Sequence, residues 1–276
     1  MKKDFSNSSL NWCFSTLGCP DYDLDEALTL ADQYKINLIE VRNLAGTIDF
    51  IPILDEYIKA FPDKVDLLKE QGRIASLDTS FPVSTNTDEE REELLRVVNL
   101  ADRFGAKHVR VFGGFPFSEE LTPERLDKGA QTLAWFDKAR AQQGFNCRML
   151  LEIHDGFSSS DRCVELMNHA GCEVDILWDA HHSYRFAGET FAYTWNQLSS
   201  QIKHIHVKDG LPIPGETEKV EHTLCGQGDI PIKDLIAMLK QEKFSGPVSL
   251  EWEKFWDRDI PDLDIALDSV IEAGWL

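Results

Sequence analysis

The sequence predicts an α/β protein, a single-domain (β/α)8 TIM barrel, from three observations. Short apolar segments alternate with longer amphipathic ones eight times along the chain. The length of 276 residues is close to the ~250 residues that are typical of one such barrel. No Ser/Gly-rich linker or low-complexity run divides the chain. We therefore expect one barrel domain over residues 11–276, preceded by an N-terminal arm of residues 1–10.

The expected strands are short apolar segments, each followed by a polar loop and an amphipathic helix. The strands are expected at 11–16, 37–42, 73–78, 107–112, 148–153, 174–179, 202–207 and 247–252. The helices are expected at 23–34, 50–60, 89–104, 123–142, 160–169, 187–200, 230–242 and 262–273. An open doubly wound sheet is the alternative. It is disfavoured because no glycine-rich phosphate loop follows any of these strands.

The ends of several helices carry their own sequence signals. Asp23 with Glu26, and Thr87 with Glu90, have the spacing of a capping box, and Thr122-Pro123 places an N-cap before a proline. Four helical segments close with a glycine just before the next strand, as a left-handed C-terminal cap requires. These glycines are Gly105, Gly144, Gly171 and Gly246.

Composition excludes several classes of protein. The chain has 28 Lys+Arg and 48 Asp+Glu, a net charge of −20, so it would repel a phosphate backbone, and general nucleic-acid binding is not expected. A hydrophobic content of 42% with 10% aromatic residues excludes wholesale disorder. No apolar run is long enough for a membrane span, and no secretory signal follows the first lysines. The six scattered cysteines lack a C-x-x-C pair, which favours a reducing, cytoplasmic location.

Charged side chains gather near the C-terminal ends of the expected strands, on the face opposite the apolar one. Glu152, Asp179, His206 and Glu251 each end one of four successive strands. Carboxylates with one imidazole are ligands that suit a divalent ion: Mn²⁺, or Mg²⁺, Zn²⁺ or Co²⁺. Ion pairing at the barrel mouth is the alternative, and for any single residue it is at least as good. For the whole set the metal site is the better interpretation, because active sites of such barrels lie at this face.

The sequence resembles the xylose-isomerase-like barrel family over nearly its whole length. The resemblance is carried by NLIEVRN, LLEIHDG, ILWDAHH, IKHIHVKDG, GQGDIP and VSLEWEKFW. That family includes sugar-phosphate isomerases and epimerases, inosose and dehydroshikimate dehydratases, and endonuclease IV. The resemblance implies a barrel that binds a divalent metal through Glu152, Asp179, His206 and Glu251. The chain departs from the family at Lys35, where a glycine is usual, and it lacks the extra histidines of the three-metal endonuclease IV, so we expect a single metal.

Six further residues are candidate substrate contacts, each with a simpler alternative. His182 is placed to hydrogen-bond a substrate hydroxyl, although His181 is an equal candidate and neither need have a role. In the simpler alternatives, His154 orients a metal ligand, Lys208 and the two arginines form ion pairs, and Trp256 packs at the rim of the barrel. The six are His154, His182, Lys208, Arg42, Arg110 and Trp256.

Three interior or loop features complete the expected site. His204 is expected to be a core histidine and Glu40 the partner of Arg42. Residues 208–229 form a long loop directly after His206, which favours a lid. His222 within this loop is expected to be solvated rather than a substrate contact.

The leading hypothesis is a metal-dependent isomerase or epimerase of carbohydrate metabolism. It would act on a sugar or sugar phosphate through an enediolate, with Glu152 and Glu251 as acid/base residues. Two glutamates on opposite faces would give 3-epimerisation, whereas one alone would exchange aldose and ketose. A hydro-lyase of the inosose or dehydroshikimate dehydratase type is the alternative, and a nuclease or a non-catalytic binder of a sugar or protein is less favoured. The expected partners are a small sugar or polyol-derived substrate and, as the commonest assembly, a second copy in a homodimer.

Overall fold

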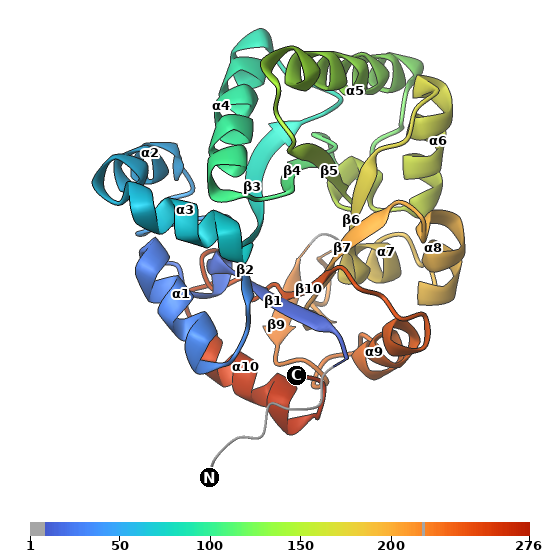
Figure 1. Cartoon of the computed structure of the whole chain (residues 1–276). Helices are drawn as coiled ribbons and strands as arrows, with labels where there is room; N and C mark the ends of the chain where they lie inside the picture. Colours follow the sequence, from blue (N-terminus) through green and yellow to red (C-terminus); the bar gives the residue numbers. More distant parts are fainter. Residues whose placement is uncertain (1–8, 217–218) are drawn as a thin grey trace. The chain divides into compact units, whose positions relative to one another are not determined.

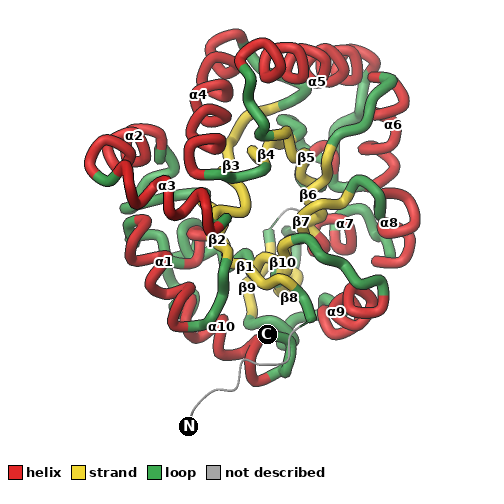
Figure 2. Tube along the Cα trace, viewed as in Figure 1, coloured by secondary structure: helices red, strands yellow, loops and turns green. Residues whose placement is uncertain are grey.

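The structure, a computed structural model, describes residues 9–216 and 219–276. Eight parallel strands form a closed barrel in the order β1-β10-β7-β6-β5-β4-β3-β2, which confirms the predicted (β/α)8 fold (Figures 1 and 2). Most of the expected arm of residues 1–10 lies outside the described residues. Two compact units make up the chain, one of residues 1–50 and 204–276 and the other of residues 51–203.

The first unit provides strands from both ends of the chain. In it, β1 pairs in parallel with β2 and with β10, and β10 pairs with β7. A separate antiparallel hairpin, β8–β9, follows β7. Its strands are β1 (Asn11–Ser15), β2 (Leu38–Val41), β7 (Ile202–Val207, which begins at the unit boundary), β8 (Asp209–Pro212), β9 (Val220–Thr223) and β10 (Pro247–Leu250). Its helices are η1 (Thr16–Gly18), α1 (Leu24–Gln33), α9 (Ile232–Gln241) and α10 (Leu263–Glu272).

The second unit contains four strands that pair in parallel in sequence order, β3-β4-β5-β6. Helices α4, α5 and α6 lie along the outside of these strands (Figure 1). The strands are β3 (Ile74–Pro82), β4 (His108–Phe112), β5 (Arg148–Glu152) and β6 (Asp175–Asp179). The helices are α2 (Ile51–Ala60), α3 (Pro62–Gln71), α4 (Asp88–Phe104), α5 (Pro123–Gln143), η2 (Asp155–Phe157), α6 (Ser160–Ala170), α7 (Ala180–Arg185) and α8 (Phe191–Leu198).

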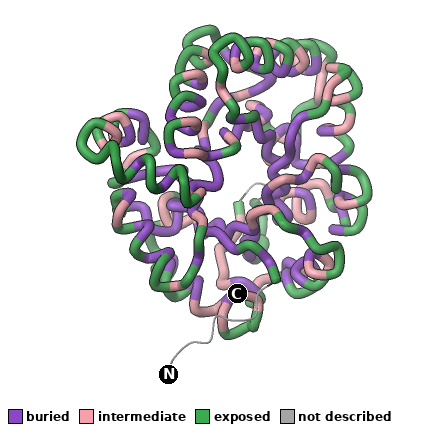
Figure 3. The backbone as a smooth tube through the Cα atoms, in the orientation of Figure 1, coloured by how far each residue is buried: buried purple, intermediate pink, exposed green. Residues whose placement is uncertain are grey.

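The eight barrel strands are buried along most of their length, as a wall between outer helices and a filled interior requires (Figure 3). In β5, for example, Leu150, Leu151 and Glu152 are buried in succession. One face packs on helices and the other fills the interior, so a charged interior residue needs a charged or hydrogen-bonding neighbour. This requirement determines the chemistry of the site below.

The predicted helix starts are confirmed. Asp23 and Glu26 form a reciprocal capping box, as do Thr87 and Glu90, and Thr122 caps α5. Left-handed caps are confirmed at Gly105, Gly144 and Gly171.

The prediction for Gly246 was wrong. Helix α9 ends at Gln241, and Lys243 adopts the positive φ of 55° instead. Because the left-handed residue is Lys243, three residues before the glycine, Gly246 lies in the segment that leads into β10 and caps no helix.

The predicted elements did not include the helices α3 and α7 or the hairpin β8–β9. Pro62 stands at the first turn of an additional helix, α3, directly after α2. The expected helix at 187–200 is shorter, α8, and is preceded by the six-residue α7. The expected loop after β7 contains the hairpin β8–β9.

Within the described residues, no helix is both long enough and apolar enough to cross a membrane. All six cysteines are free thiols. Burial, with a smaller contribution from Glu26, raises the pKa of the Cys19 thiol to about 12.

Candidate functional site

In the second unit, Glu152 ends β5 and lies against Arg110 of the neighbouring strand β4. Arg110 Nη1 lies 3.1 Å from Glu152 Oε2, and Arg110 Nε lies 3.8 Å from Asp78 Oδ2. The Arg110 guanidinium also lies 4.0 Å from the ring of Phe112. Arg110 is only 1% exposed, so the structure places this candidate substrate contact in a buried ion pair with Glu152.

Asp179 ends β6 and begins α7. Its Oδ1 accepts hydrogen bonds from the backbone N–H groups of His181 (2.9 Å) and His182 (3.1 Å). This cap brings His182 Nε2 within 3.9 Å of Asp179 Oδ2. The His154 ring lies beside that of His182, with centroids 3.9 Å apart. The structure therefore brings Asp179 together with both predicted histidines, His154 and His182.

Asp155 is a residue that sequence reasoning missed. Its carboxylate accepts hydrogen bonds from the backbone N–H groups of Gly113 (3.1 Å) and Gly114 (2.8 Å), which fixes the loop after β4. Burial raises its pKa to about 6, and these hydrogen bonds only partly oppose the effect. The E-x-H-D segment contained the signal, since a carboxylate three residues after Glu152 faces the same end of the barrel.

In the first unit, Glu40 crosses the interior from β2 to reach two histidines of β7. Glu40 Oε2 lies 3.1 Å from His204 Nε2 and 3.0 Å from His206 Nε2, and all three side chains are buried. Burial alone would raise the pKa of Glu40. The charge of His206 and the hydrogen bonds of both imidazoles outweigh it and hold the pKa well below the usual range. Glu40 thus has two partners that were not predicted, His204 and His206, while its expected pairing with Arg42 stays a prediction.

His206 continues into a chain of charged groups that ends at the hairpin. His206 Nδ1 lies 3.2 Å from Glu251 Oε2, and the same oxygen accepts a hydrogen bond of 2.7 Å from Lys208 Nζ. Lys208 Nζ also donates to Glu253 Oε1 (2.6 Å), and His222 Nε2 lies 3.7 Å from Glu253 Oε2. Burial opposes ionisation of Glu251, but His206 and Lys208 together hold its pKa well below the usual value.

The remaining candidate contacts of the first unit differ in exposure. Lys208 is buried between two carboxylates, as described above. The guanidinium carbon of Arg42 lies 6.0 Å from the ring of Trp256. Arg42 is buried, whereas Trp256 is 55% exposed, so Trp256 is the more accessible of these two. His222 was expected to be solvated, but its side chain is only 13% exposed because it faces Glu253.

Asp209 organises the loop that follows β7. Its Oδ1 accepts hydrogen bonds from the backbone N–H groups of Gly210 (2.9 Å) and Ile230 (3.2 Å), and its Oδ2 accepts from Gly226 (2.8 Å) and Gly228 (3.0 Å). One buried carboxylate thus joins the beginning of the loop to its end. The predicted long loop contains the hairpin β8–β9, and Asp209 joins the residues at its base; a role as a lid stays a prediction.

Comparisons with known proteins identify the fold family. The family described as xylose isomerase-like TIM barrel matches residues 25–270. The chain belongs to this family. Sequence comparison with curated proteins finds no match.

Three solved structures illustrate the similarity of the fold. The IolI protein with a bound zinc atom has a TM-score of 0.72 and 17% identity, covering 96% of both chains. The probable 3-DHS dehydratase AsbF from Bacillus anthracis has a TM-score of 0.73 and 16% identity, covering 96% of this chain and 98% of its own. The 3-keto-D-glucoside 4-epimerase YcjR from E. coli has a TM-score of 0.70 and 13% identity, covering 97% of this chain and all of its own. At such identities these likenesses establish the fold.

Proposed function

We propose that the protein is a divalent-metal-dependent isomerase or epimerase that acts on a sugar or sugar phosphate. The observation that carries the proposal is a buried acid or imidazole at the C-terminal end of each of four strands that are consecutive in the barrel order, β5, β6, β7 and β10. Active sites of (β/α)8 barrels lie at this end. Family membership and the similarity to an epimerase structure support the same class of reaction.

We propose that Glu152, Asp179, His206 and Glu251 hold the metal. Three carboxylates and one imidazole are a donor set that could bind such an ion, and Mn²⁺, Mg²⁺, Zn²⁺ and Co²⁺ all accept these ligands. Buried carboxylates cost several kcal/mol per ion unless cations offset them, and a divalent ion would add to the positive charge that Arg110 and Lys208 place beside Glu152 and Glu251. The zinc in the IolI structure is consistent with a metal in this family.

When bound, a divalent cation supplies positive charge that lowers the free energy of an enediolate. The chain's own groups then move the proton. Arg110 beside Glu152 favours the carboxylate form of that residue, and Lys208 and His206 do the same for Glu251. Each glutamate is therefore a base at neutral pH, able to take the proton from the carbon next to a carbonyl. Removal by one glutamate and return by the other epimerises the carbon, whereas transfer by a single glutamate exchanges aldose and ketose.

Dehydration is a second candidate function, favoured by the adjacent rings of His154 and His182 beside Asp179. Either imidazole, when protonated, is placed to donate a proton to a departing hydroxyl group after the α-proton has been removed. The similarity to a probable dehydratase structure supports this alternative. A conjugated enone, detected by its absorbance, would distinguish dehydration from epimerisation.

The test uses the full chain with Mn²⁺ and a panel of ketoses, ketose phosphates and inososes in D₂O. NMR detects deuterium incorporation at the carbon next to the carbonyl, together with any epimer or isomer formed. Glu152→Gln and Glu251→Gln should each lose more than the ~10²–10⁴-fold that a general base contributes, since each also weakens the metal. Glu221→Gln, an exposed acid-to-amide change on β9, is the matched control and should keep full activity. Near-normal turnover in either glutamate variant with metal still bound would refute the assignment of that glutamate as an acid/base residue.

Metal removal provides an independent test. EDTA should abolish turnover and lower the melting temperature without unfolding the barrel at room temperature, because the apolar core does not depend on the ion. Adding back metal at a hundredfold excess over Kd should restore about 2.7 kcal/mol. If Mn²⁺, Mg²⁺, Zn²⁺ and Co²⁺ all leave the melting temperature unchanged and activity survives EDTA, the metal proposal fails.

A further inference from the structure

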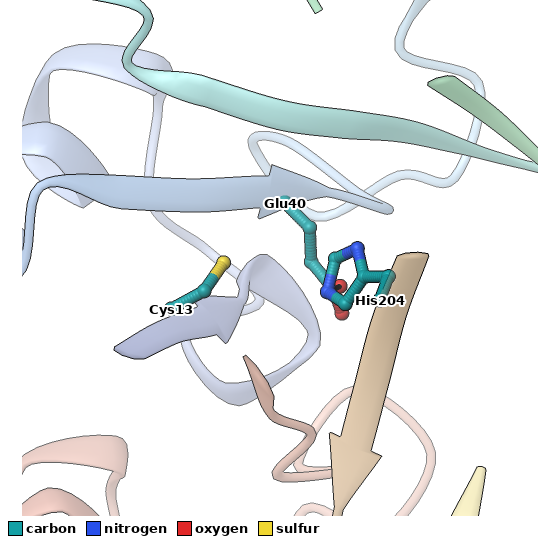
Figure 4. Close-up of side chains that lie close together, drawn as sticks. All are labelled: Cys13, Glu40 and His204. Atoms are coloured by element: carbon teal, nitrogen blue, oxygen red, sulfur yellow. Dashed lines mark ion pairs between the residues drawn. The ribbon is translucent and has the colours of Figure 1, made fainter. Parts of the chain in front are cut away.

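Glu40 makes an unusual contact for a buried acid, because one of its oxygens serves two imidazoles. His204 and His206 lie two residues apart on β7, so both side chains point to the same face of the strand. Both present Nε2 to Glu40 Oε2, at 3.1 and 3.0 Å. Figure 4 shows the Glu40 carboxylate against the His204 ring, with Cys13 on the neighbouring strand.

This geometry fixes the proton of the His206 ring. An ionised carboxylate only accepts hydrogen bonds, so His206, whose Nε2 is hydrogen-bonded to Glu40 Oε2, must carry a proton on that nitrogen. Burial makes a bare Nε2 costly, because it would face the Glu40 oxygen with neither a proton nor a cation to offset the carboxylate. His206 Nδ1 faces Glu251 Oε2 at 3.2 Å, and there a divalent ion held by both residues would offset the carboxylate in place of a proton. A metal ligand must present an unprotonated nitrogen, and a hydrogen bond at the other nitrogen determines which one it is.

We infer that Glu40 is a positioning residue: it holds the Nε2–H of His206 and thereby presents Nδ1 of that ring as the metal-binding atom. The inference rests on the proposed metal function and adds a residue that contacts neither metal nor substrate. His204 lies against Glu40 from the same side, with its Nε2 3.1 Å from the same oxygen, so the carboxylate is held between the two rings.

A competing arrangement involves the same carboxylate as a ligand. Cys13, Glu40 and His204 each offer a donor atom, and these three atoms lie within 4.8 Å of one another. A cation there would have to come between His204 Nε2 and Glu40. It would use the Cys13 thiolate as well, whereas the positioning role requires nothing of Cys13. The competing arrangement therefore predicts that removal of the Cys13 sulfur weakens metal binding, whereas the positioning role predicts no change.

The experiment uses the full chain with ¹⁵N-labelled histidine and Zn²⁺, which is diamagnetic. Long-range ¹H–¹⁵N NMR should show His206 with zinc at Nδ1 and a proton retained at Nε2. Glu40→Gln keeps the side-chain volume but loses the charge, and it should weaken zinc affinity about 10–100-fold while keeping the same stoichiometry. Cys13→Ser, the matched control, should leave affinity unchanged.

Each result decides the matter. Zinc bound at Nε2 of His206 in the wild-type protein would overturn the inference. This measurement does not depend on whether the Glu40 variant folds. Unchanged affinity in Glu40→Gln, or loss of zinc in Cys13→Ser, also overturns it while leaving the proposed function intact. A wild-type chain that binds no zinc overturns the metal function and this inference with it.

Discussion

Asp209 offers a sharp test of how the loop after β7 is held. Asp209→Asn replaces one acceptor oxygen with an NH₂ group, which cannot accept from the two N–H donors on its side. Two of the four backbone hydrogen bonds, to Gly210 and Ile230 or to Gly226 and Gly228, are then lost. Hydrogen bonds to a charged group contribute about 1.5–3 kcal/mol each, so the loop should lose roughly 3–6 kcal/mol of local stability.

Hydrogen–deuterium exchange measured by mass spectrometry reports this loss directly. Peptides covering residues 210–230 should exchange about 10²–10⁴-fold faster, since each 1.4 kcal/mol changes the opening equilibrium tenfold. Glu221→Gln is the control for an acid-to-amide change in the same loop. Gly228→Ala should reproduce the Asp209 effect, because its added Cβ would lie 2.1 Å from Asp209 Oδ1. Unaltered exchange over 210–230 in Asp209→Asn would refute the reasoning that this carboxylate fixes the loop.

Two further predictions concern stability. Lys35 has a φ of 55°, and a left-handed backbone costs a non-glycine residue ~1–2 kcal/mol, so Lys35→Gly should raise the free energy of unfolding by about 0.5–1 kcal/mol once glycine's entropy is subtracted. Lys243, also at a φ of 55°, should respond to Lys243→Gly in the same way. Urea unfolding measures both changes, and a loss of stability in both variants would contradict the backbone strain. The pKa of Asp155 rises from 3.8 to about 6 on folding, so its favourable contribution is complete below pH 3.8 and is lost as the pH rises through 6. Roughly 3 kcal/mol is the upper bound of that loss. Asp155→Asn should therefore flatten the decline in stability between pH 4 and 7, and equal slopes in both proteins would show that another group is responsible.

Local signals predicted the fold well because the barrel is a repeated local unit. The capping boxes at Asp23 and Thr87 use residues three positions apart, so their sequence spacing is their geometry. The hairpin β8–β9 was missed because it has little apolar periodicity. Its order comes instead from Asp209, which binds N–H groups up to 21 residues away. Helix α7 was missed because six residues show no helical period, and its start depends on the Asp179 cap.

The candidate site was predicted from equally local signals. Alternation along a strand and a position at its end are local properties, and they selected Glu152, Asp179, His206 and Glu251 as candidate ligands, an assignment that stays a prediction. The partner of Glu40 was not predictable in this way. Strands β2 and β7 are not neighbours in the barrel order, so the contact of Glu40 with His204 and His206 spans the interior. Sequence spacing does not report which side chains meet there.

The series of buried ionic contacts in the first unit is better explained by function than by stability. It runs through His204, Glu40, His206, Glu251 and Lys208, all of them buried. Apolar side chains of similar volume commonly stabilise a protein as well as a buried ion pair does, or by 1–4 kcal/mol more. A barrel interior needs only to be filled, so stability alone does not require these charges. A functional role accounts for them. At one end of this series of contacts, His206 and Glu251 would present fixed, ionised or proton-accepting atoms to a substrate and its metal. At the other end, Glu40 and His204 would hold those atoms in place.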